Sequence, residues 1–185
     1  MKGFSRSEIR FSLCGLNCLL CTMHLGGYCP GCGGGAGNQS CAKARCSLQH
    51  RGIQFCWECP EYPCPHYEGF DVADSFVPHS SRQQNIDEFR QLGLKDYLSN
   101  LEEKRAILDE LLYRYNDGRR KTLFATAVYL LPLEDLRPVM AALNNAPVAA
   151  SLPVKERALL AAGLLQKKAA VRGVSLKLNK KTKKE

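Results

Sequence analysis

The feature that most constrains this chain is the placement of its cysteines. The chain has 185 residues and ten cysteines, and all ten lie between Cys14 and Cys64. Inside this segment, residues 29–47 contain no Ile, Leu, Val, Phe, Met, Trp or Tyr. Such a stretch cannot bury enough apolar surface to offset the conformational entropy that folding costs. It must therefore stay disordered or be held by cross-links, and the regular spacing of the cysteines favours cross-links.

The cross-links that we expect are metal–thiolate bonds. The first residues, MKGFSRSEIRFSLC, contain no apolar run of the length of a secretory signal. We therefore expect a cytoplasmic protein, in which cysteines stay reduced and bind metal rather than form disulfides. No stretch of 18 or more apolar residues occurs, so we expect no contact with a membrane. Metal binding would supply the folding free energy that so small a core cannot.

The spacing of the cysteines is typical of metal ligands. Three CxxC pairs occur in one short segment, at Cys18/Cys21, Cys29/Cys32 and Cys56/Cys59. Two intervening residues let both sulfurs of a pair reach one ion, and tetrahedral zinc bound by four sulfurs suits such pairs. The candidate metal ligands are all ten cysteines: Cys14, Cys18, Cys21, Cys29, Cys32, Cys41, Cys46, Cys56, Cys59 and Cys64.

Spacing alone does not show which cysteines share an ion. One economical grouping places Cys18, Cys21, Cys29 and Cys32 on one zinc ion, and Cys41, Cys46, Cys56 and Cys59 on a second. Cys14 and Cys64 are then left over, and a crossed arrangement that uses them is equally allowed. His24, His50 and His66 are close enough in sequence to replace a thiolate. For these histidines, an ordinary surface or hydrogen-bonded role is the favoured interpretation.

An iron–sulfur cluster is the alternative to zinc. A [4Fe–4S] cluster also takes four thiolates, and Cys-Pro steps such as Cys29-Pro30 occur in ferredoxin motifs. The spacing of Cys14, Cys18 and Cys21 also matches radical S-adenosylmethionine enzymes. Those enzymes have repeated βα units, whereas the chain after Cys64 has the pattern of helices. We therefore expect zinc, as two ions, with [4Fe–4S] as the alternative cofactor.

From about Asp87 onward the sequence has the periodicity of helices. Ser99 and Glu102 have the spacing of a capping box. The helix that follows carries Leu101, Leu108, Leu111, Leu112 and Tyr115 on one face and ends at the turn Asn116-Asp117-Gly118. Further helices are expected at 121–131, 134–143 and 154–172, the second with Leu136, Val139, Met140 and Leu143 facing inward.

The predicted fold class is a small metal-stabilised cysteine-rich domain with little regular structure, followed by an all-α bundle of about four helices. The expected divisions are a cysteine-rich metal-binding domain at 11–70, a helical domain at 82–175 and a basic tail at 176–185. The start of that last segment is expected to be a short strand or an extended piece. Trp57 and Tyr62 flank a cysteine pair, and we expect them to pack the cysteine-rich domain against the helices.

Positive charge is concentrated near residue 185. The formal net charge of the chain is +8, and residues 166–185 carry eight Lys or Arg and one Glu. The cluster Lys177–Lys184 could contact nucleic-acid phosphates, but it has no aromatic residues for stacking, so a solubilising tail is favoured. Arg119, Arg120 and Lys121 could hold an anion, but a solvated turn that forms salt bridges with acids of the preceding helix is favoured there.

Several motifs follow one another in a specific order. They are Cys14-Gly15-Leu16-Asn17-Cys18, Cys29-Pro30-Gly31-Cys32 and Cys56-Trp57-Glu58-Cys59-Pro60-Glu61-Tyr62-Pro63-Cys64, and later Asn116-Asp117-Gly118-Arg119-Arg120-Lys121 and Leu130-Leu131-Pro132-Leu133-Glu134. In these motifs the chain resembles the domain of unknown function 3795 family, over residues 11–70 and a helical extension that some members carry. Ala125 is a departure, because some relatives have a further cysteine near it. The resemblance implies zinc binding and brings no reaction with it.

The favoured function is that of a zinc-stabilised interaction module with a protein partner. One alternative is an iron–sulfur redox protein. Another is a zinc-dependent enzyme with an open coordination position, which uses Arg119, Arg120 or a histidine on an anionic substrate. The sequence contains no GxSxG or HExxH motif and no phosphate-binding glycine loop, so it indicates no enzyme class.

Overall fold

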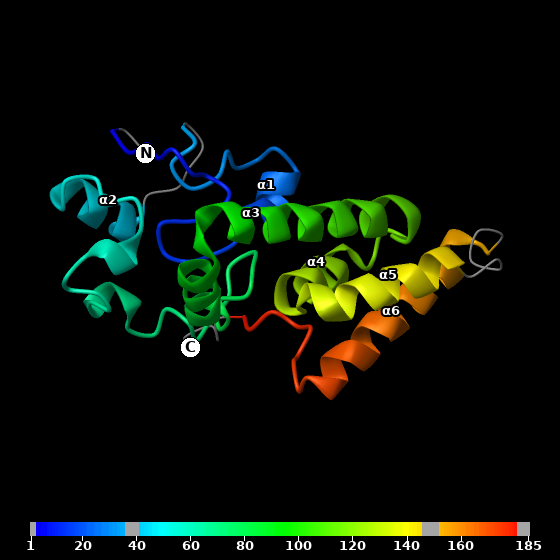
Figure 1. The fold of residues 1–185 in the computed structure, drawn as a ribbon. Coiled ribbons are helices and arrows are strands. Elements are labelled where there is room, and N and C mark those ends of the chain that lie inside the picture. The colour runs from blue at the N-terminus through cyan, green and yellow to red at the C-terminus, as the bar shows by residue number, and fades with distance from the viewer. Residues whose placement is uncertain (1–2, 36–40, 146–151, 181–185) are drawn as a thin grey trace, which may run out of the picture. The chain divides into compact units, whose positions relative to one another are not determined.

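The computed structural model describes residues 3–35, 41–145 and 152–180, and these residues are mostly helical (Figure 1). They contain six α-helices: α1 (Thr22–Leu25), α2 (Ala42–Gln49), α3 (Arg82–Arg114), α4 (Lys121–Leu130), α5 (Leu133–Asn145) and α6 (Val154–Val171). Three short 3-10 segments lie among the cysteines: η1 (Cys18–Leu20), η2 (Cys56–Glu58) and η3 (Pro65–Tyr67). No strand occurs in these ranges, where a lone bridge pairs Phe11 with Asn17. The prediction of a helical chain whose N-terminal region has little regular structure is confirmed.

The chain divides into two compact units. Unit 1 comprises Met1–Leu98 together with Leu178–Glu185, and unit 2 comprises Ser99–Lys177. The division therefore falls inside α3. The domain bounds expected from the sequence, 11–70, 82–175 and 176–185, stay predictions, because compact packing does not by itself define a domain that folds alone.

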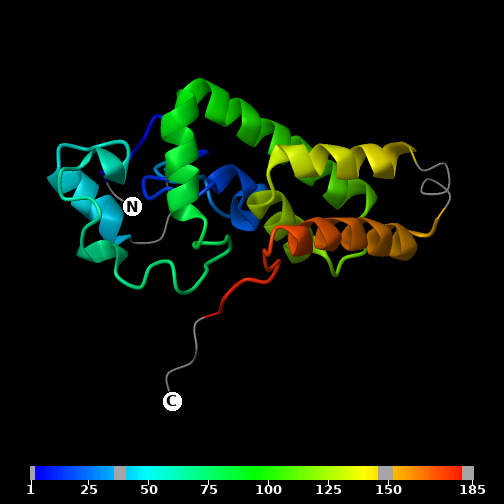
Figure 2. The same ribbon diagram turned by 60° about the horizontal axis from the view of Figure 1, so that its bottom comes forward.

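Helix α3 is bent at Gly93, as Figure 2 shows. Gly93 has φ 78° and ψ 166°, a conformation that is open almost only to glycine. The helix begins at Arg82, and Ser99 lies inside it. The predicted helix start at the Ser99–Glu102 capping box is therefore wrong. The turns before Ser99 also carry apolar residues at helical spacing, Ile86, Phe89 and Tyr97, and the helix continues through Ser99.

The core of unit 1 contains an aromatic cluster, which we define as Phe11, Phe55, Trp57, Phe89 and Tyr97. The Phe11 ring is fully buried and lies 5.3 Å from the Phe89 ring and 5.0 Å from the Tyr97 ring, measured between centroids. The Trp57 ring lies 5.3 Å from Phe89 of α3. The cluster supplies the apolar contacts that the cysteine segment lacks. It confirms the prediction that Trp57 packs this segment against a helix.

The first turns of α3 lie directly on the loop that follows Cys14. Gly15 has φ +95°, and a Cβ atom there would lie 2.7 Å from the Ile86 side chain. The Asn85 amide donates a hydrogen bond to the Gly15 carbonyl at 3.2 Å, and the Tyr97 hydroxyl donates one to the Asn17 side chain at 2.8 Å. The close approach requires glycine at position 15, because any side chain would collide with the helix.

Unit 2 consists of the end of α3 with α4, α5 and α6. The predicted inward faces are confirmed: Leu101, Leu108, Leu111, Tyr115, Leu136, Val139, Met140 and Leu143 are buried. Leu112 is half-buried, at the edge of its face. Helix α6 packs against α4 and α5, and Figures 1 and 2 show α5 and α6 side by side. The core is thus built from the apolar stripes that the sequence periodicity predicts.

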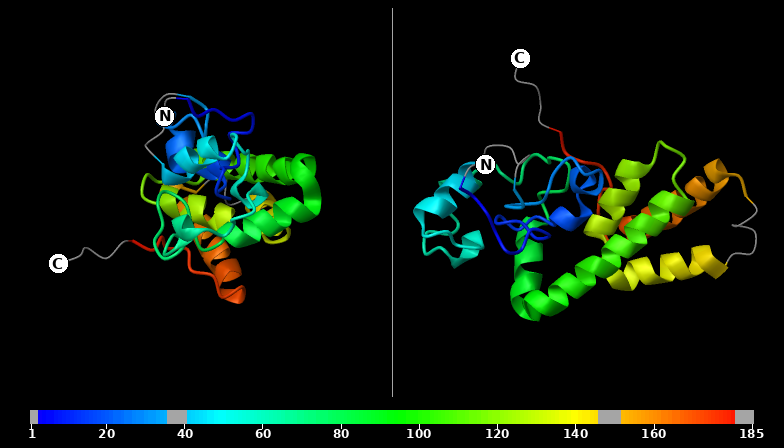
Figure 3. Two further views of the ribbon diagram at one scale, coloured as in Figure 1. Left: turned by 90° about the vertical axis from the view of Figure 1, so that its left-hand side faces the viewer. Right: turned by 90° about the horizontal axis from the view of Figure 1, so that it is seen from above.

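The chain after α6 has no regular structure up to Lys180 (Figure 3). The expected short strand is therefore not formed in the described residues, and Lys181–Lys184 of the basic tail lie outside them. Within unit 1, the Asp74 amide donates to the Asn179 carbonyl at 2.8 Å, and the Asn179 amide donates to the Asp74 carboxylate at 2.7 Å. Among the described helices, none has the length and apolar character needed to cross a membrane.

Candidate metal centre

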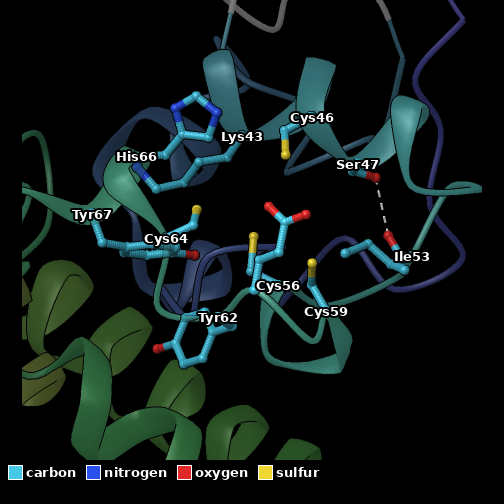
Figure 4. Close-up of a pocket in the computed structure, with 11 residues that line it drawn as sticks. Lys43, Cys46, Ser47, Ile53, Cys56, Cys59, Tyr62, Cys64, His66 and Tyr67 are labelled. Carbon is cyan, nitrogen blue, oxygen red and sulfur yellow. Dashed lines mark hydrogen bonds between the residues drawn. The ribbon is translucent and has the colours of Figure 1, made fainter.

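Four cysteines line one pocket in unit 1. They are Cys46 on α2, Cys56 at the start of η2, Cys59 directly after η2, and Cys64 directly before η3. We call this site the thiol pocket. Figure 4 shows the side chains of these cysteines around one shared space. The other residues that line the pocket are Lys43, Ser47, Ile53, Glu61, Tyr62, His66 and Tyr67.

The CxxC turn at Cys56 is held by backbone hydrogen bonds. The Cys56 amide donates to the Leu13 carbonyl at 2.8 Å, and the Cys59 amide donates to the Cys56 carbonyl at 3.1 Å. The Glu58 carboxylate accepts hydrogen bonds from the amides of Gln54 and Phe55, at 3.0 and 3.1 Å. These contacts fix the two sulfurs of the turn on one side of the backbone, as a pair of metal ligands requires.

A buried cation and a buried hydroxyl group also belong to the pocket. Lys43 is 8% exposed, and its Nζ atom lies 3.5 Å from the centroid of the Phe70 ring and 4.6 Å from that of Tyr67. The Tyr67 hydroxyl is buried and has no hydrogen-bond partner in the described part of the chain. Buried polar groups without partners are rare in folded proteins, so this hydroxyl indicates an acceptor close by.

Burial favours the protonated form of two cysteines of the pocket, Cys56 and Cys46, because it raises the pKa of each thiol. It raises the pKa of the Cys56 thiol to about 12, and the neighbouring Tyr67 hydroxyl and the charge of Lys43 act in the opposite direction. The pKa of Cys46 is raised by burial and by the neighbouring Cys64 and Cys59. Burial and the adjacent Cys56 also raise the pKa of Tyr67. A bound metal cation is the usual means by which such thiols become thiolates.

A second group of thiols lies around Cys14, Cys18, Cys21 and Cys32. Burial and the charge of Cys32 raise the pKa of Cys14 to about 11, against a hydrogen bond with Ser12 that acts to lower it. The pKa of Cys18 is raised well above its ordinary value by burial and then by Cys32, Cys14 and Cys21. The Leu13 amide donates to the Cys32 sulfur at 3.4 Å, which is a contact typical of thiolate ligands. We call these four cysteines the second thiol group.

Arg6 is the buried cation beside the second thiol group. It donates hydrogen bonds to the carbonyls of Phe11 at 2.9 Å, Cys32 at 3.2 Å and Gln54 at 2.9 Å. Its Nη2 atom is buried without a partner in the described residues. The charge of Arg6 and a hydrogen bond from it act to lower the pKa of Cys32, against the rise that burial causes. The Arg6 side chain therefore also faces a cysteine sulfur.

The structure groups the cysteines differently from the economical grouping. Cys64 joins Cys46, Cys56 and Cys59 in the thiol pocket, and Cys14 joins the second thiol group, so neither is left over. Cys41 is exposed. A negative charge at Cys41 acts to raise the pKa of Cys14 and of Cys32, which belong to the second thiol group. This is a crossed arrangement of the kind that spacing also allowed. The assignment of all ten cysteines as ligands stays a prediction.

The residues of the two sites suit a metal by their chemical type, which is cysteine sulfur, and by the hydrogen-bond donors that lie beside them. Among the residues that the structure describes, no three His, Cys, Asp or Glu side chains converge in the arrangement of a metal site. Four cysteines around one pocket nevertheless suit zinc or an iron–sulfur cluster. The unpartnered Tyr67 hydroxyl and Arg6 Nη2 are also next to cysteines, where a metal-bound thiolate would accept their hydrogen bonds. The residues thus fit a thiolate-bound metal, although the sulfurs are not drawn together around one point.

Two of the candidate histidines have other partners. The His24 Nδ1 atom lies 2.9 Å from the Cys29 carbonyl oxygen. The His50 Nδ1 atom lies 2.9 Å from the Cys46 carbonyl oxygen, and its Nε2 atom lies 3.5 Å from the Glu61 carboxylate. His66 lines the thiol pocket. The favoured interpretation of hydrogen-bonded histidines is therefore confirmed for His24 and His50.

The basic residues of the turn before α4 bind an acidic residue of the same turn, Asp117. Arg120 forms a salt bridge with Asp117, and the Arg119 amide donates to the Asp117 carboxylate at 3.1 Å. The interpretation of this segment as a turn with a salt bridge is confirmed, but the expected partner, an acid of the preceding helix, is wrong. Asp117 belongs to the turn itself, after α3 ends at Arg114. The geometry gives no support to an anion site there.

Sequence reasoning missed Arg6, Lys43 and Tyr67 as parts of the thiol sites. The available signal for Lys43 was its position between Cys41 and Cys46, in a stretch with almost no other side chain able to line a pocket. Arg6 and Tyr67 have no local signal, because their roles depend on contacts made by the folded chain.

The fold and the pocket together define a cysteine-rich, mostly helical protein with two groups of half-buried cysteines. In comparisons with known proteins, no family model, no curated protein and no solved structure matches the chain. The resemblance to the domain of unknown function 3795 family accordingly rests on the quoted motifs and stays a prediction.

Proposed function

We propose that the protein is a zinc-binding interaction module in which Cys46, Cys56, Cys59 and Cys64 hold one zinc ion. The observation that carries this proposal is that these four cysteines, from α2 and the turns on both sides of residues 60–63, line one pocket. When bound, zinc would act as a structural cross-link and contribute to folding. The cross-link would join α2 to η2 and η3 in a segment with few apolar residues of its own.

The second thiol group is the proposed site of a second zinc ion. The proposed ligands are Cys14, Cys18, Cys21 and Cys32, because the charges of the other three all act to raise the pKa of Cys18. Membership of the domain of unknown function 3795 family and a cytoplasmic location belong to this proposal. They are supported by the quoted motifs and by the number and spacing of the cysteines.

The proposed partner is a protein. Zinc bound by four sulfurs has no coordination position for a substrate, so such a site is structural rather than catalytic. Large apolar side chains on unit 1 are available for a contact, since Tyr28, Val72 and Phe76 are more than half exposed. The proposal therefore contains no reaction.

Metal analysis of the full chain, purified without oxygen, tests the proposal. We expect about two zinc ions per chain and no visible absorption band. The variant C56S/C59S should lose one zinc ion. The matched control C41S changes an exposed cysteine outside the thiol pocket, and it should lose none. Iron and sulfide with a visible band would replace the proposal with a redox cluster, and a folded protein without either metal would refute it.

A further inference from the structure

We infer that Lys43 is a positioning residue of the thiol pocket, whose buried ammonium group offsets the charge of the four cysteines when they bind a metal as thiolates. The inference rests on the proposed function and assigns a role that no cysteine motif encodes. It concerns how tightly the pocket holds a metal.

Position on α2 directs Lys43 toward the pocket. Lys43 lies three residues before Cys46, and residues with this spacing share one face of a helix. Both residues line the thiol pocket, and Figure 4 shows the Lys43 side chain beside His66, with its end toward Tyr67. Within the described chain, Lys43 is the only Lys or Arg that lines this pocket. Burial of a lysine is unusual and calls for a compensating contact.

The contacts of Lys43 hold its charge in place without neutralising it. Its Nζ atom lies over the rings of Phe70 and Tyr67, and it forms no salt bridge with any residue that the structure describes. Cation–π contacts attract an ammonium group but leave its net charge intact. Arg82 provides the contrast, because it also lies over the Tyr67 ring, yet Asp71 binds its guanidinium group at 2.8 and 2.9 Å. The unneutralised charge is therefore that of Lys43.

The charge balance of a filled pocket requires such a cation. A zinc ion with four thiolates has a net charge of −2, and a buried net charge is costly in a medium of low dielectric constant. The other ionisable groups that line the pocket are Glu61, which pairs with His50, together with His66, Tyr62 and Tyr67. Glu61 adds a further negative charge. Lys43 thus supplies the one permanent positive side-chain charge in the described lining.

Cobalt binding to the full-length chain tests this inference. Affinity is measured by competition with a chelator, and the sulfur-to-cobalt charge-transfer absorption reports how many thiolates bind. K43M keeps most of the length of the side chain and removes its charge, and K43R keeps the charge. R45M removes one charge from an exposed position on the same helix and serves as the control.

We expect K43M to weaken cobalt binding at the thiol pocket by about 10- to 100-fold, the range typical for residues that support metal ligands. Its charge-transfer absorption should also fall, while K43R and R45M should resemble the unmodified chain. F70L keeps the charge but removes one ring that holds it, and it should cause a smaller loss. F70L keeps the test decisive if K43M folds poorly, as judged by helix content.

The outcomes separate the inference from the proposed function. If K43M and F70L bind cobalt as tightly as the unmodified chain while C56S/C59S does not, Lys43 has no such role and the proposed function stands. If K43M and R45M lose cobalt affinity equally, the effect is one of net charge in general. If K43M and K43R lose cobalt affinity equally, the effect is one of side-chain shape. Either result overturns the inference. If the unmodified chain binds neither zinc nor cobalt in the pocket, the proposed function itself fails.

Discussion

Gly15 shows how one residue determines a contact between distant parts of unit 1. A Cβ atom at Gly15 would lie 2.7 Å from Ile86, whereas a Cβ atom at Gly52, which also has positive φ, would meet no atom within 4 Å. We expect G15A to lower the free energy of unfolding by about 1–3 kcal/mol more than G52A does. The backbone strain from a positive φ is common to both variants, so the difference reports the collision with α3.

Urea denaturation of both variants, followed by circular dichroism, measures this difference. An accompanying I86A substitution should remove much of the additional loss in G15A, because it removes the atoms that collide. Equal losses in G15A and G52A would mean that α3 does not rest on the loop after Cys14.

At the scale of single residues, sequence patterns predicted buried leucines well and predicted Lys43 poorly. Leu108 and Leu136 are buried because apolar side chains on a helical period face the core. Lysine is normally exposed, so only the fold could show that Lys43 is buried over two rings. The partition of the cysteines was equally hidden, because Cys64 reaches Cys46 through turns whose geometry does not follow from spacing.

At the scale of elements, α5 and α6 are joined by a charged contact at Asp135. Arg172 donates a hydrogen bond to Asp135 at 2.6 Å, and Lys168 donates one at 3.3 Å. Burial acts to raise the pKa of Asp135, but the hydrogen bonds and charges of Arg172 and Lys168 outweigh it, so the pKa lies below its ordinary value. The carboxylate is therefore more stable in the folded chain than in the unfolded chain.

The contribution of Asp135 to the free energy of unfolding should depend on pH. A lowered pKa in the folded chain stabilises it above the ordinary pKa of an aspartate, about 4, and this contribution disappears as the pH falls through the folded value. D135N should therefore be less stable than the unmodified chain at pH 7, and the two should converge under strongly acidic conditions. Thermal unfolding of both chains between pH 2 and pH 7, at about one-unit steps, measures this convergence. A constant difference across this range would contradict the expectation.

The elements themselves were predicted unevenly, for physical reasons. Helices α4, α5 and α6 were predicted nearly to their ends, because Pro132, Pro153 and the turn at Gly118 are local breakers that act on short stretches. Helix α2 was missed. Its eight residues have no apolar stripe, so hydrophobic periodicity does not indicate a helix there.

At the scale of the whole molecule, the two units should respond differently to removal of metal. Unit 2 has an apolar core that includes Leu108, Phe124 and Leu165, whereas the cysteine segment of unit 1 has few apolar residues. We expect a strong chelator to disrupt unit 1 and to leave most helical signal of unit 2 intact. Trp57 is the only tryptophan and lies in the aromatic cluster of unit 1, so its fluorescence reports that unit.

The measurement is tryptophan fluorescence and far-ultraviolet circular dichroism on one sample during chelation. Fluorescence should shift toward that of exposed tryptophan, with a much smaller fractional loss of helix signal, and added zinc should reverse both. Simultaneous and complete loss of both signals would show that unit 2 also depends on metal.

Sequence analysis had no means of predicting where residues 178–180 lie. Asp74 and Asn179 are 105 positions apart, and neither has a pattern that indicates the other. Their paired hydrogen bonds place this segment in unit 1, while everything from Ser99 to Lys177 belongs to unit 2. The expected basic tail is therefore in part a structural piece of the cysteine-rich unit.

This pairing has a consequence for the order in which the chain is completed on the ribosome. Unit 2 is continuous in sequence, so all of its residues have been synthesised before Asn179 is added. Unit 1 is discontinuous, and its Asp74–Asn179 contact must wait for residues made after every helix of unit 2. Because domains form as their residues become available, the helical unit can finish folding first. The cysteine-rich unit, although it is synthesised first, is completed last.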